Sequence, residues 1–169
     1  MSIFLISSFL IGIILLFFYL ILWRINTRKY ISSGTVASAY DSWTQDKLLE
    51  RLWGEHIHLG FYPSNKNIDF REAKVKFVHE LVSWSGLDKL PRGSRVLDVG
   101  CGIGGSSRIL ANYYGFNVTG ITISPAQVKR ATELTSCDCT CNFKVMDALD
   151  LKFEEGEFDG VWSLSLIHI

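Results

Sequence analysis

The chain has 169 residues, of which 48% are hydrophobic, and its 17 basic and 17 acidic side chains leave no formal net charge. This composition excludes a wholly disordered chain, and the neutral charge argues against a basic nucleic-acid-binding protein, so we expect no nucleic-acid partner. Only one long apolar run is present, which excludes a membrane protein with several spans.

That run occupies residues 1–23, which carry no charged side chain. A helix over Ile3–Trp23 would be about 30 Å long, matching the hydrocarbon thickness of a bilayer. Arg24, Arg28 and Lys29 follow directly, and no small-residue cleavage site lies close behind. We therefore predict a transmembrane anchor, with the lipid bilayer as a partner and the later residues on the cytoplasmic or plastid-stromal side. The alternative is a helix buried in a protein core.

Residues 24–39 are mostly polar and small, and are predicted to form a juxtamembrane tether. Residues 40–93 then form a predicted helical lid. Its first helix is expected to begin at the capping-box pattern of Ser42 and Gln45 and to continue to about Trp53.

The second part of the lid begins with Gly54–Ser64, a stretch rich in glycine, histidine and aromatic residues that predicts a loop. Asp69 and Glu72 have the spacing of a helix cap, and apolar residues follow at helical spacing. A second amphipathic helix is therefore predicted, ending at Gly86.

Strand and helix patterns alternate over residues 94–163. One predicted helix ends near Tyr114, and another begins at Ser124, where the capping serine is followed by Pro125 and, three residues on, by Gln127. Such alternation with short connections predicts a parallel, doubly wound α/β sheet. The predicted strands cover 95–99, 116–121, 142–146 and 158–163.

A glycine-rich loop lies between the first of these strands and the helix after it. Gly100, Gly102 and Gly105 form the G-x-G-x-x-G pattern of a cofactor-binding turn. Asp98 precedes them, which gives D-x-G-x-G-x-G through Gly104. A carboxylate would repel a pyrophosphate but would attract the ammonium of S-adenosylmethionine. We therefore predict that Asp98 and the glycines at 100, 102 and 104 bind this cofactor.

Two later positions bear on the same choice. An NAD enzyme needs an acidic residue at the end of the second strand, and this chain has Thr122 there, which disfavours NAD. Many methyltransferases also carry an acid at this point, so the departure counts against both cofactors. Asp147 follows the third strand and could accept a hydrogen bond from the adenine amino group, with the Ala148 amide facing the ring. The alternative role for Asp147 is that of a turn residue.

The segment V-L-D-V-G-C-G-I-G-G at 96–105 resembles the first motif of class I S-adenosylmethionine-dependent methyltransferases. Narrower blocks resemble the tocopherol-pathway branch of that family, and the cyanobacterial-type 2-methyl-6-phytyl-1,4-benzoquinol methyltransferases within it. The resemblance covers about residues 30–163 and implies a Rossmann-like fold. It also implies methyl transfer to a ring carbon of a prenylated quinol in tocopherol and plastochromanol synthesis. The narrower blocks are Y-D-S-W-T at 40–44, W-G-E-H-I-H at 53–58 and T-I-S-P-A-Q-V at 122–128.

The same resemblance implies further contacts with the cofactor. Thr122, Ile123 and Gln127 match a block that lies near the cofactor in related branches. Tyr40 is expected to close over the methionine end. No residue is assigned as the catalytic base.

His56 and His58 are two residues apart, so on an extended segment their side chains would point the same way. One interpretation makes His56 a substrate contact or a general base at the quinol. The alternative is a polar pair that is hydrogen-bonded within the lid.

Cysteine spacing gives no metal site. Cys137, Cys139 and Cys141 are each separated by one residue, whereas zinc ligands usually stand roughly two to four residues apart. Together with Cys101, they are expected to be reduced thiols.

The sheet that the resemblance implies has about seven strands in the order 3-2-1-4-5-7-6, of which residues 94–163 supply about four. Residues 164–169 are expected to be a non-native tail translated from adapter DNA, and we expect the chain alone to be poorly folded and inactive. Two alternatives remain: a non-catalytic S-adenosylmethionine-binding fragment, and a related tocopherol or sterol-type methyltransferase.

Overall fold

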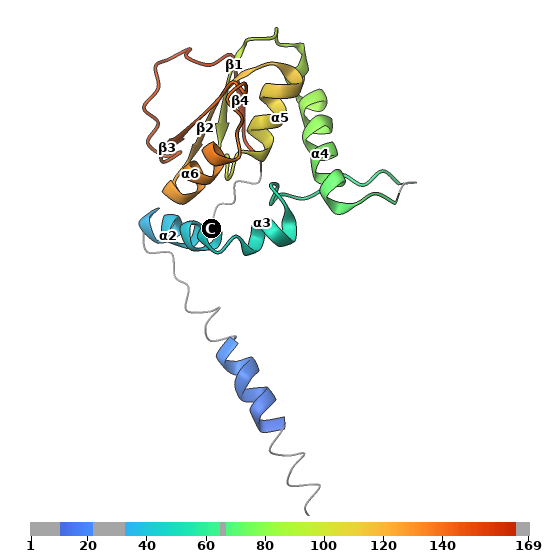
Figure 1. The fold of residues 1–169 in the computed structure, drawn as a ribbon, viewed down its shortest axis with the longest axis vertical. Helices are drawn as coiled ribbons and strands as arrows, with labels where there is room; N and C mark the ends of the chain where they lie inside the picture. Colours follow the sequence, from blue (N-terminus) through green and yellow to red (C-terminus); the bar gives the residue numbers. More distant parts are fainter. Residues whose placement is uncertain (1–10, 22–32, 65–66, 165–169) are drawn as a thin grey trace, which may run out of the picture. The chain divides into compact units, whose positions relative to one another are not determined.

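The computed structural model describes residues 11–21, 33–64 and 67–164 of the chain. The chain divides into two compact units, Met1–Ile31 and Ser32–Ile169. In the first unit, the described residues form one helix, drawn in blue in Figure 1.

The described part of this helix covers residues 11–21 of the apolar run. At about 1.5 Å per residue, that described part is about 16 Å long, roughly half the thickness of bilayer hydrocarbon. Among the residues that the structure describes, no helix is both long and apolar enough to cross a membrane. This finding overturns the transmembrane helix predicted over residues 1–23, of which 1–10 and 22–23 lie outside the described part. The prediction rested on a count of apolar residues, whereas the finding concerns the length of the helices in the described part of the chain.

Four other expectations are affected by the same limits. The bilayer as a partner was inferred from the same apolar run and is not confirmed. The cytoplasmic or plastid-stromal location stays a prediction. Residues 24–32 of the expected tether and residues 165–169 of the expected tail lie outside the described residues.

The second unit is built on a four-stranded parallel sheet with the strand order β3-β2-β1-β4 (Figure 1). This arrangement confirms the predicted parallel α/β sheet, and each strand begins and ends within two residues of its predicted limits. The strands are β1 (Arg95–Val99), β2 (Asn117–Thr122), β3 (Cys141–Val145) and β4 (Gly160–Trp162).

Helices pack against the sheet, and the hydrophobic core lies between them. The β1-α5-β2 and β2-α6-β3 connections step the same way across the sheet, so right-handed crossovers place both helices on one face. The main cluster joins α4 and α5 to the sheet, and each fully buried side chain in it stabilises the fold by about 1.5–3 kcal/mol. The helices are α4 (Phe70–Ser85), α5 (Gly105–Tyr114) and α6 (Pro125–Glu133), and the cluster contains Val78, Val82, Val96, Leu110, Ala111, Phe116, Val118 and Trp162.

The predicted ends of these helices are confirmed by their caps. The Asp69 carboxylate accepts a 2.8 Å hydrogen bond from the Arg71 amide at the start of α4. Gly86 ends α4 with φ 75°, in the left-handed region that glycine adopts most readily, and a short turn of 3₁₀ helix, Leu87–Lys89, follows. Ser124 Oγ accepts a 3.1 Å bond from the Gln127 amide at the start of α6.

The predicted single helix from Ser42 to about Trp53 is wrong. The structure has α2 (Ser33–Gln45) and α3 (Leu48–Trp53), separated where Lys47 adopts a left-handed φ of 52°. Ser42 lies inside α2, and its hydroxyl donates to the Ser38 carbonyl at 3.0 Å instead of capping a helix. The α2 helix also begins within the residues expected to form the tether. It packs against α6, beside the site described next.

Candidate cofactor and substrate site

The glycine loop reverses the chain directly after β1. Gly100, Gly102 and Gly104 have φ values of 76°, 56° and 80°, a region in which other residues are strained. A Cβ added at Gly102 would meet no atom within 4 Å, so this side of the loop is open. A Cβ at Gly104 would lie 2.6 Å from the Phe143 ring, so that glycine also permits close packing against β3.

Asp98 lies near the end of β1, and only 2% of its surface is exposed. Burial raises the pKa of its carboxyl from the ordinary 3.8 to about 7, and the hydrogen bond from Ser107 Oγ, 2.6 Å long, opposes this rise. Among the ion pairs of the described residues, none includes Asp98. A buried carboxylate without a counter-ion is suited to a cationic ligand group, which is what the ammonium of S-adenosylmethionine would supply.

A second cluster of polar residues surrounds the start of α6. Thr122 Oγ1 and Gln127 Oε1 are 2.6 Å apart, and both side chains are buried. Ser124 Oγ donates to the Asp41 carboxylate, which also accepts a 3.1 Å bond from the Ala126 amide. Asp41, which our sequence reasoning missed, therefore ties α2 to α6. Its only sequence signal is its place in the Y-D-S-W-T block.

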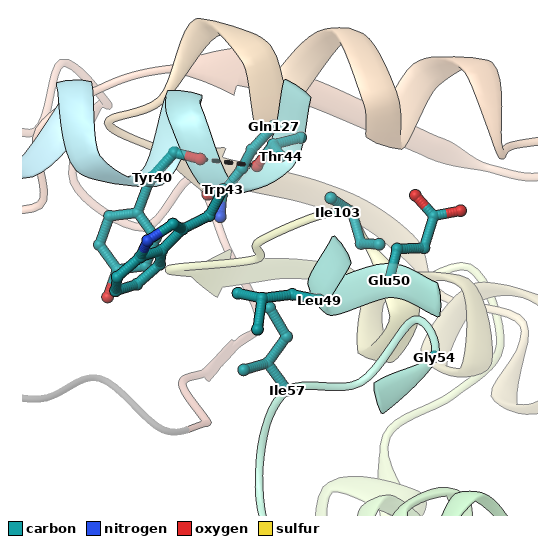
Figure 2. A pocket seen from close by; sticks show the side chains of 9 residues that line it. All are labelled: Tyr40, Trp43, Thr44, Leu49, Glu50, Gly54, Ile57, Ile103 and Gln127. Atoms are coloured by element: carbon teal, nitrogen blue, oxygen red, sulfur yellow. Dashed lines mark hydrogen bonds between the residues drawn. The ribbon is translucent and has the colours of Figure 1, made fainter. Parts of the chain in front are cut away.

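A pocket lies between α2, α3, the glycine loop and α6 (Figure 2). It brings together Tyr40 and Gln127, which the sequence placed in one site, with Ile103 of the glycine loop. Figure 2 shows Tyr40 beside Trp43, and their rings meet edge to face with centroids 5.5 Å apart. The full lining is Tyr40, Trp43, Thr44, Leu49, Glu50, Gly54, Ile57, Ile103 and Gln127.

Other predicted cofactor residues do not line this pocket. Thr122 is buried and hydrogen-bonded to Gln127, and Ile123 is half-buried. Asp147 Oδ1 accepts a 2.9 Å bond from the Leu149 amide, which is the turn role weighed as its alternative. Ala148 is exposed. The Met146 amide donates to the Thr122 carbonyl at 3.0 Å, so the chain before Asp147 lies beside the end of β2. The adenine contacts stay predictions.

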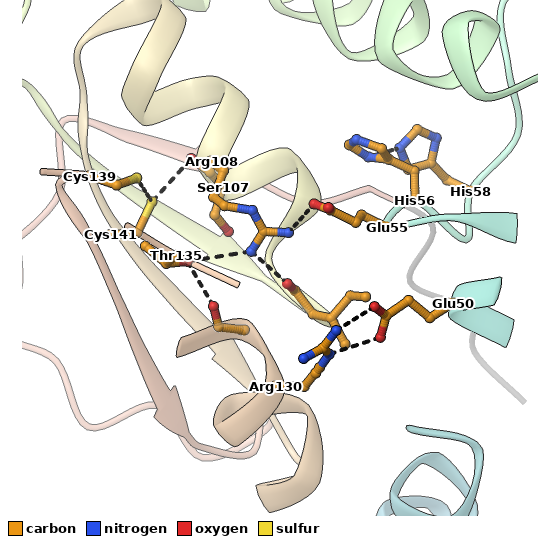
Figure 3. A network of polar contacts seen from close by, with 12 residues as sticks. Glu50, Glu55, His56, His58, Ser107, Arg108, Arg130, Thr135, Cys139 and Cys141 are labelled. Carbon is orange, nitrogen blue, oxygen red and sulfur yellow. Dashed lines mark hydrogen bonds and ion pairs between the residues drawn. The ribbon is translucent and has the colours of Figure 1, made fainter. Parts of the chain in front are cut away.

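Two ion pairs fasten the lid over the site (Figure 3). Arg130 of α6 binds Glu50 of α3 through two bonds of 2.9 and 2.6 Å, and this contact lowers the pKa of Glu50. Arg108 of α5 binds Glu55 at 2.5 Å. Our sequence reasoning missed all four residues, because their partners are far apart in the chain and no local pattern connects them.

The two histidines form the hydrogen-bonded pair that the sequence analysis gave as the alternative to a substrate contact (Figure 3). His56 Nδ1 lies 3.1 Å from His58 Nε2, and His58 Nδ1 lies 2.7 Å from the Leu59 carbonyl oxygen. Burial is the main cause that lowers the pKa of His56 to about 4, and burial also lowers the pKa of His58. Both rings are therefore neutral near pH 7.

The loop that carries these histidines is held between α4, which contains Lys74, and the start of α5. Lys74 Nζ donates to the carbonyls of His56 and Trp53 at 2.7 and 3.0 Å. A Cβ added at Gly105 would lie 2.6 Å from the Glu55 carbonyl oxygen and 2.9 Å from the His56 ring. His56 is therefore placed beside the residue at which the glycine loop ends.

Cys101 is a buried free thiol within the glycine loop, and Cys141 Sγ lies 3.3 Å from the Ser107 carbonyl oxygen. Cys139 and Cys141 have their sulfur atoms 3.3 Å apart as free thiols, and burial raises the pKa of Cys141. In residues 11–21, 33–64 and 67–164, no group of three or more histidine, cysteine or acidic residues could hold a metal ion.

The strand order, the glycine loop after β1 and the buried acid before it define a Rossmann-like cofactor-binding domain. A family model described as a methyltransferase domain matches residues 96–169. This match and the similar proteins below confirm the methyltransferase family and the S-adenosylmethionine cofactor inferred from the motifs.

The chain is similar to three known proteins, two by sequence and one by structure. It is 61% identical over 146 residues to 2-methyl-6-phytyl-1,4-hydroquinone methyltransferase of Synechocystis sp., covering 85% of this chain and 45% of that protein. It is 41% identical over 128 residues to the chloroplastic tocopherol O-methyltransferase of Arabidopsis thaliana, covering 69% and 37%. The crystal structure of a putative sarcosine dimethylglycine methyltransferase from Galdieria sulphuraria matches with a TM-score of 0.63 and 29% identity, covering 73% and 48%. The chain thus spans less than half the length of these relatives.

Proposed function

We propose that the complete protein transfers a methyl group from S-adenosylmethionine to a ring carbon of a prenylated benzoquinol in tocopherol and plastochromanol synthesis. The observation that carries this proposal is the 61% identity, over 85% of the chain, to a relative named for such a quinol. The buried carboxylate of Asp98 beside the open glycine loop fits the cofactor that this reaction needs.

The residues that would hold the cofactor come from three elements and the loops between them. Asp98 would attract the ammonium group, and the backbone of the glycine loop, open at Gly102, would lie along the amino-acid part. Tyr40 and Gln127, which line the pocket, would enclose it from the side of the lid. When bound, S-adenosylmethionine supplies an electrophilic methyl group on its sulfonium sulfur.

The protein's own task is then chiefly to place the acceptor. A quinol ring is rich in electrons, and its ring carbon becomes more nucleophilic as a hydroxyl proton is withdrawn. Holding that carbon in line with the methyl group removes much of the entropic barrier. The ion pairs of Glu50 and Glu55 serve this purpose by keeping the lid against α5 and α6.

A second candidate is an O-methyltransferase acting on a tocopherol, which the 41% identity to the Arabidopsis enzyme favours. A sterol-type methyltransferase and a cofactor-binding protein without activity complete the set of candidates.

An acceptor panel tests these candidates. Because the chain spans 45% of its Synechocystis relative, the test uses the complete product of the gene. The purified protein is given methyl-labelled S-adenosylmethionine with phytyl-benzoquinol, solanesyl-benzoquinol or γ-tocopherol. We expect label in the two benzoquinols. Label in γ-tocopherol alone would favour the second candidate, and binding of S-adenosylhomocysteine without any transfer would indicate an inactive cofactor-binding protein.

A further inference from the structure

The His56–His58 pair carries a consequence for the acceptor, which rests on the proposed function. We infer that His56 offers an unprotonated Nε2 to a hydroxyl of the acceptor and that His58 holds it in this tautomer. The pair thereby makes the site select the reduced quinol over the oxidised quinone.

The tautomer follows from one end of the hydrogen-bonded chain. The Leu59 carbonyl oxygen can only accept, so the proton between it and His58, 2.7 Å away, resides on His58 Nδ1. A neutral His58 then has a lone pair on Nε2, which accepts from His56 Nδ1 at 3.1 Å. With its proton on Nδ1, a neutral His56 has only a lone pair at Nε2.

The surroundings keep the pair neutral. Lys74 places its ammonium 2.7 Å from the His56 carbonyl oxygen, and the guanidinium of Arg108 lies across from the loop on Glu55. Glu55 is the one neighbouring acid that favours a charged His56, but its carboxylate is paired with Arg108. Burial adds to the cationic neighbours in opposing a second proton on either ring.

Nε2 of His56 is also the atom left for a ligand. In the described part of the chain, the hydrogen bonds of His56 involve its Nδ1 and its carbonyl oxygen. The ring lies against Gly105, where the glycine loop meets α5. An acceptor that reaches this ring beside the glycine loop would meet, at Nε2, a side chain that can accept a hydrogen bond and cannot donate one.

This polarity distinguishes the two redox states of one ring. A benzoquinol carries two hydroxyl donors, one of which can be bonded by Nε2. The corresponding quinone presents only carbonyl oxygens, so two acceptors would face each other and both would lose hydrogen bonds to water. A site built to bond a hydroxyl rejects an analogue that lacks it, and we expect a preference of about tenfold to a hundredfold.

Competition between the two states tests the selectivity. The complete product of the gene is assayed without oxygen, with the KM of the phytyl-quinol and the inhibition constant of the same compound as its quinone. We expect the quinone constant to exceed the quinol KM by about tenfold or more. In His56→Gln the amide can donate to the quinone, so the ratio should fall towards one. The control is His79→Gln, which removes another paired histidine, one bonded to Tyr114 at 2.8 Å, and should leave the ratio unchanged.

A spectroscopic measurement tests the tautomer without any turnover. In protein labelled with ¹⁵N-histidine, we expect His56 to be protonated at Nδ1 and bare at Nε2. His58→Phe removes the acceptor for this proton and should return His56 to a mixture of tautomers.

The outcomes separate the inference from the proposed function. A proton on Nε2 of His56 in the unaltered protein, or an unchanged ratio in His56→Gln, would overturn the inference. Binding of S-adenosylhomocysteine with unaltered affinity shows that a variant is folded. Failure of the unaltered protein to methylate any quinol would overturn the proposed function instead, and the ¹⁵N spectrum would still decide the tautomer.

Discussion

Ser107 Oγ donates a 2.6 Å hydrogen bond to the buried carboxylate of Asp98, and this bond joins the first turn of α5 to the end of β1. The glycine loop lies between the two residues, so the bond holds both ends of that loop. Because one carboxylate oxygen bonds Ser107, the other remains for a ligand. Asp98 is therefore central to the account of the cofactor site.

Affinity for the cofactor should depend on the charge of Asp98. The pKa of this group is raised to about 7, so its ionised fraction increases between about pH 6 and pH 8. We expect S-adenosylhomocysteine, which has the same ammonium group, to bind more tightly as pH rises through this range. Asp98→Asn should bind it about tenfold or more weakly, with little pH dependence. Titration calorimetry at about pH 6 and pH 8 measures the dissociation constant for each protein. Equal pH dependence in the two proteins would contradict the assignment of Asp98 as the partner of the ammonium group.

Stability without cofactor should show the opposite dependence on pH. The folded-state pKa of Asp98 lies above its ordinary value of 3.8, so the folded state binds this proton more tightly than the unfolded state does. The stability that this proton contributes is complete below about pH 4 and is lost as pH rises through about 7. The loss amounts to at most about 4 kcal/mol.

Urea unfolding at about pH 5 and pH 8 tests this dependence. We expect Asp98→Asn to lose most of the decline in the free energy of unfolding. Asp147→Asn changes a less buried acid at a turn and should keep it. An unchanged decline in Asp98→Asn would show that other groups cause it.

A methyl group at Gly102 should block the cofactor. Gly102 and Gly156 both have positive φ, at 56° and 73°, and a Cβ at either would meet no atom within 4 Å. Each change to alanine should therefore cost about 1 kcal/mol of stability through backbone strain alone. Only Gly102→Ala should also weaken the binding of S-adenosylhomocysteine, by about tenfold or more. Equal affinities for the two variants would place the ligand elsewhere.

The Arg130–Glu50 pair should stabilise the closed lid. Its two hydrogen bonds and partial burial favour a coupling energy of about 1 kcal/mol in a double-mutant cycle of Glu50→Gln and Arg130→Gln. The Lys76–Glu80 pair is more exposed, lies on one helix and should give less than about 0.5 kcal/mol. Unfolding in about 1 M salt should reduce both couplings. Equal coupling energies in the two pairs would mean that the lid contact adds no more stability than an exposed pair on one helix.

Local patterns predicted most of the second unit. The run Arg95–Val99 is apolar enough to predict a short buried strand. Asp69, Gly86 and Ser124 mark helix ends through their own backbone and side-chain preferences. Parallel order then follows from short connections between alternating elements.

The errors and omissions arise where structure depends on distant residues or on helix continuity. The Ser42 pattern fits a capping box, yet α2 passes through it because the helix begins earlier and packs on α6. The apolar run at the start of the chain has the composition of a span, but no described helix has the required length. The bonds from Asp41 to α6 and from Glu50 to Arg130 join residues about eighty positions apart, a separation that no periodic pattern records.

The position of the transferred methyl group tests the central claim most directly. The complete product of the gene is incubated with phytyl-benzoquinol and S-adenosylmethionine carrying a ¹³C-methyl group, and the product is examined by carbon NMR. We expect one labelled methyl group bonded to a ring carbon. Label in a methoxy group, or no labelled product from a protein that binds S-adenosylhomocysteine, would contradict the account.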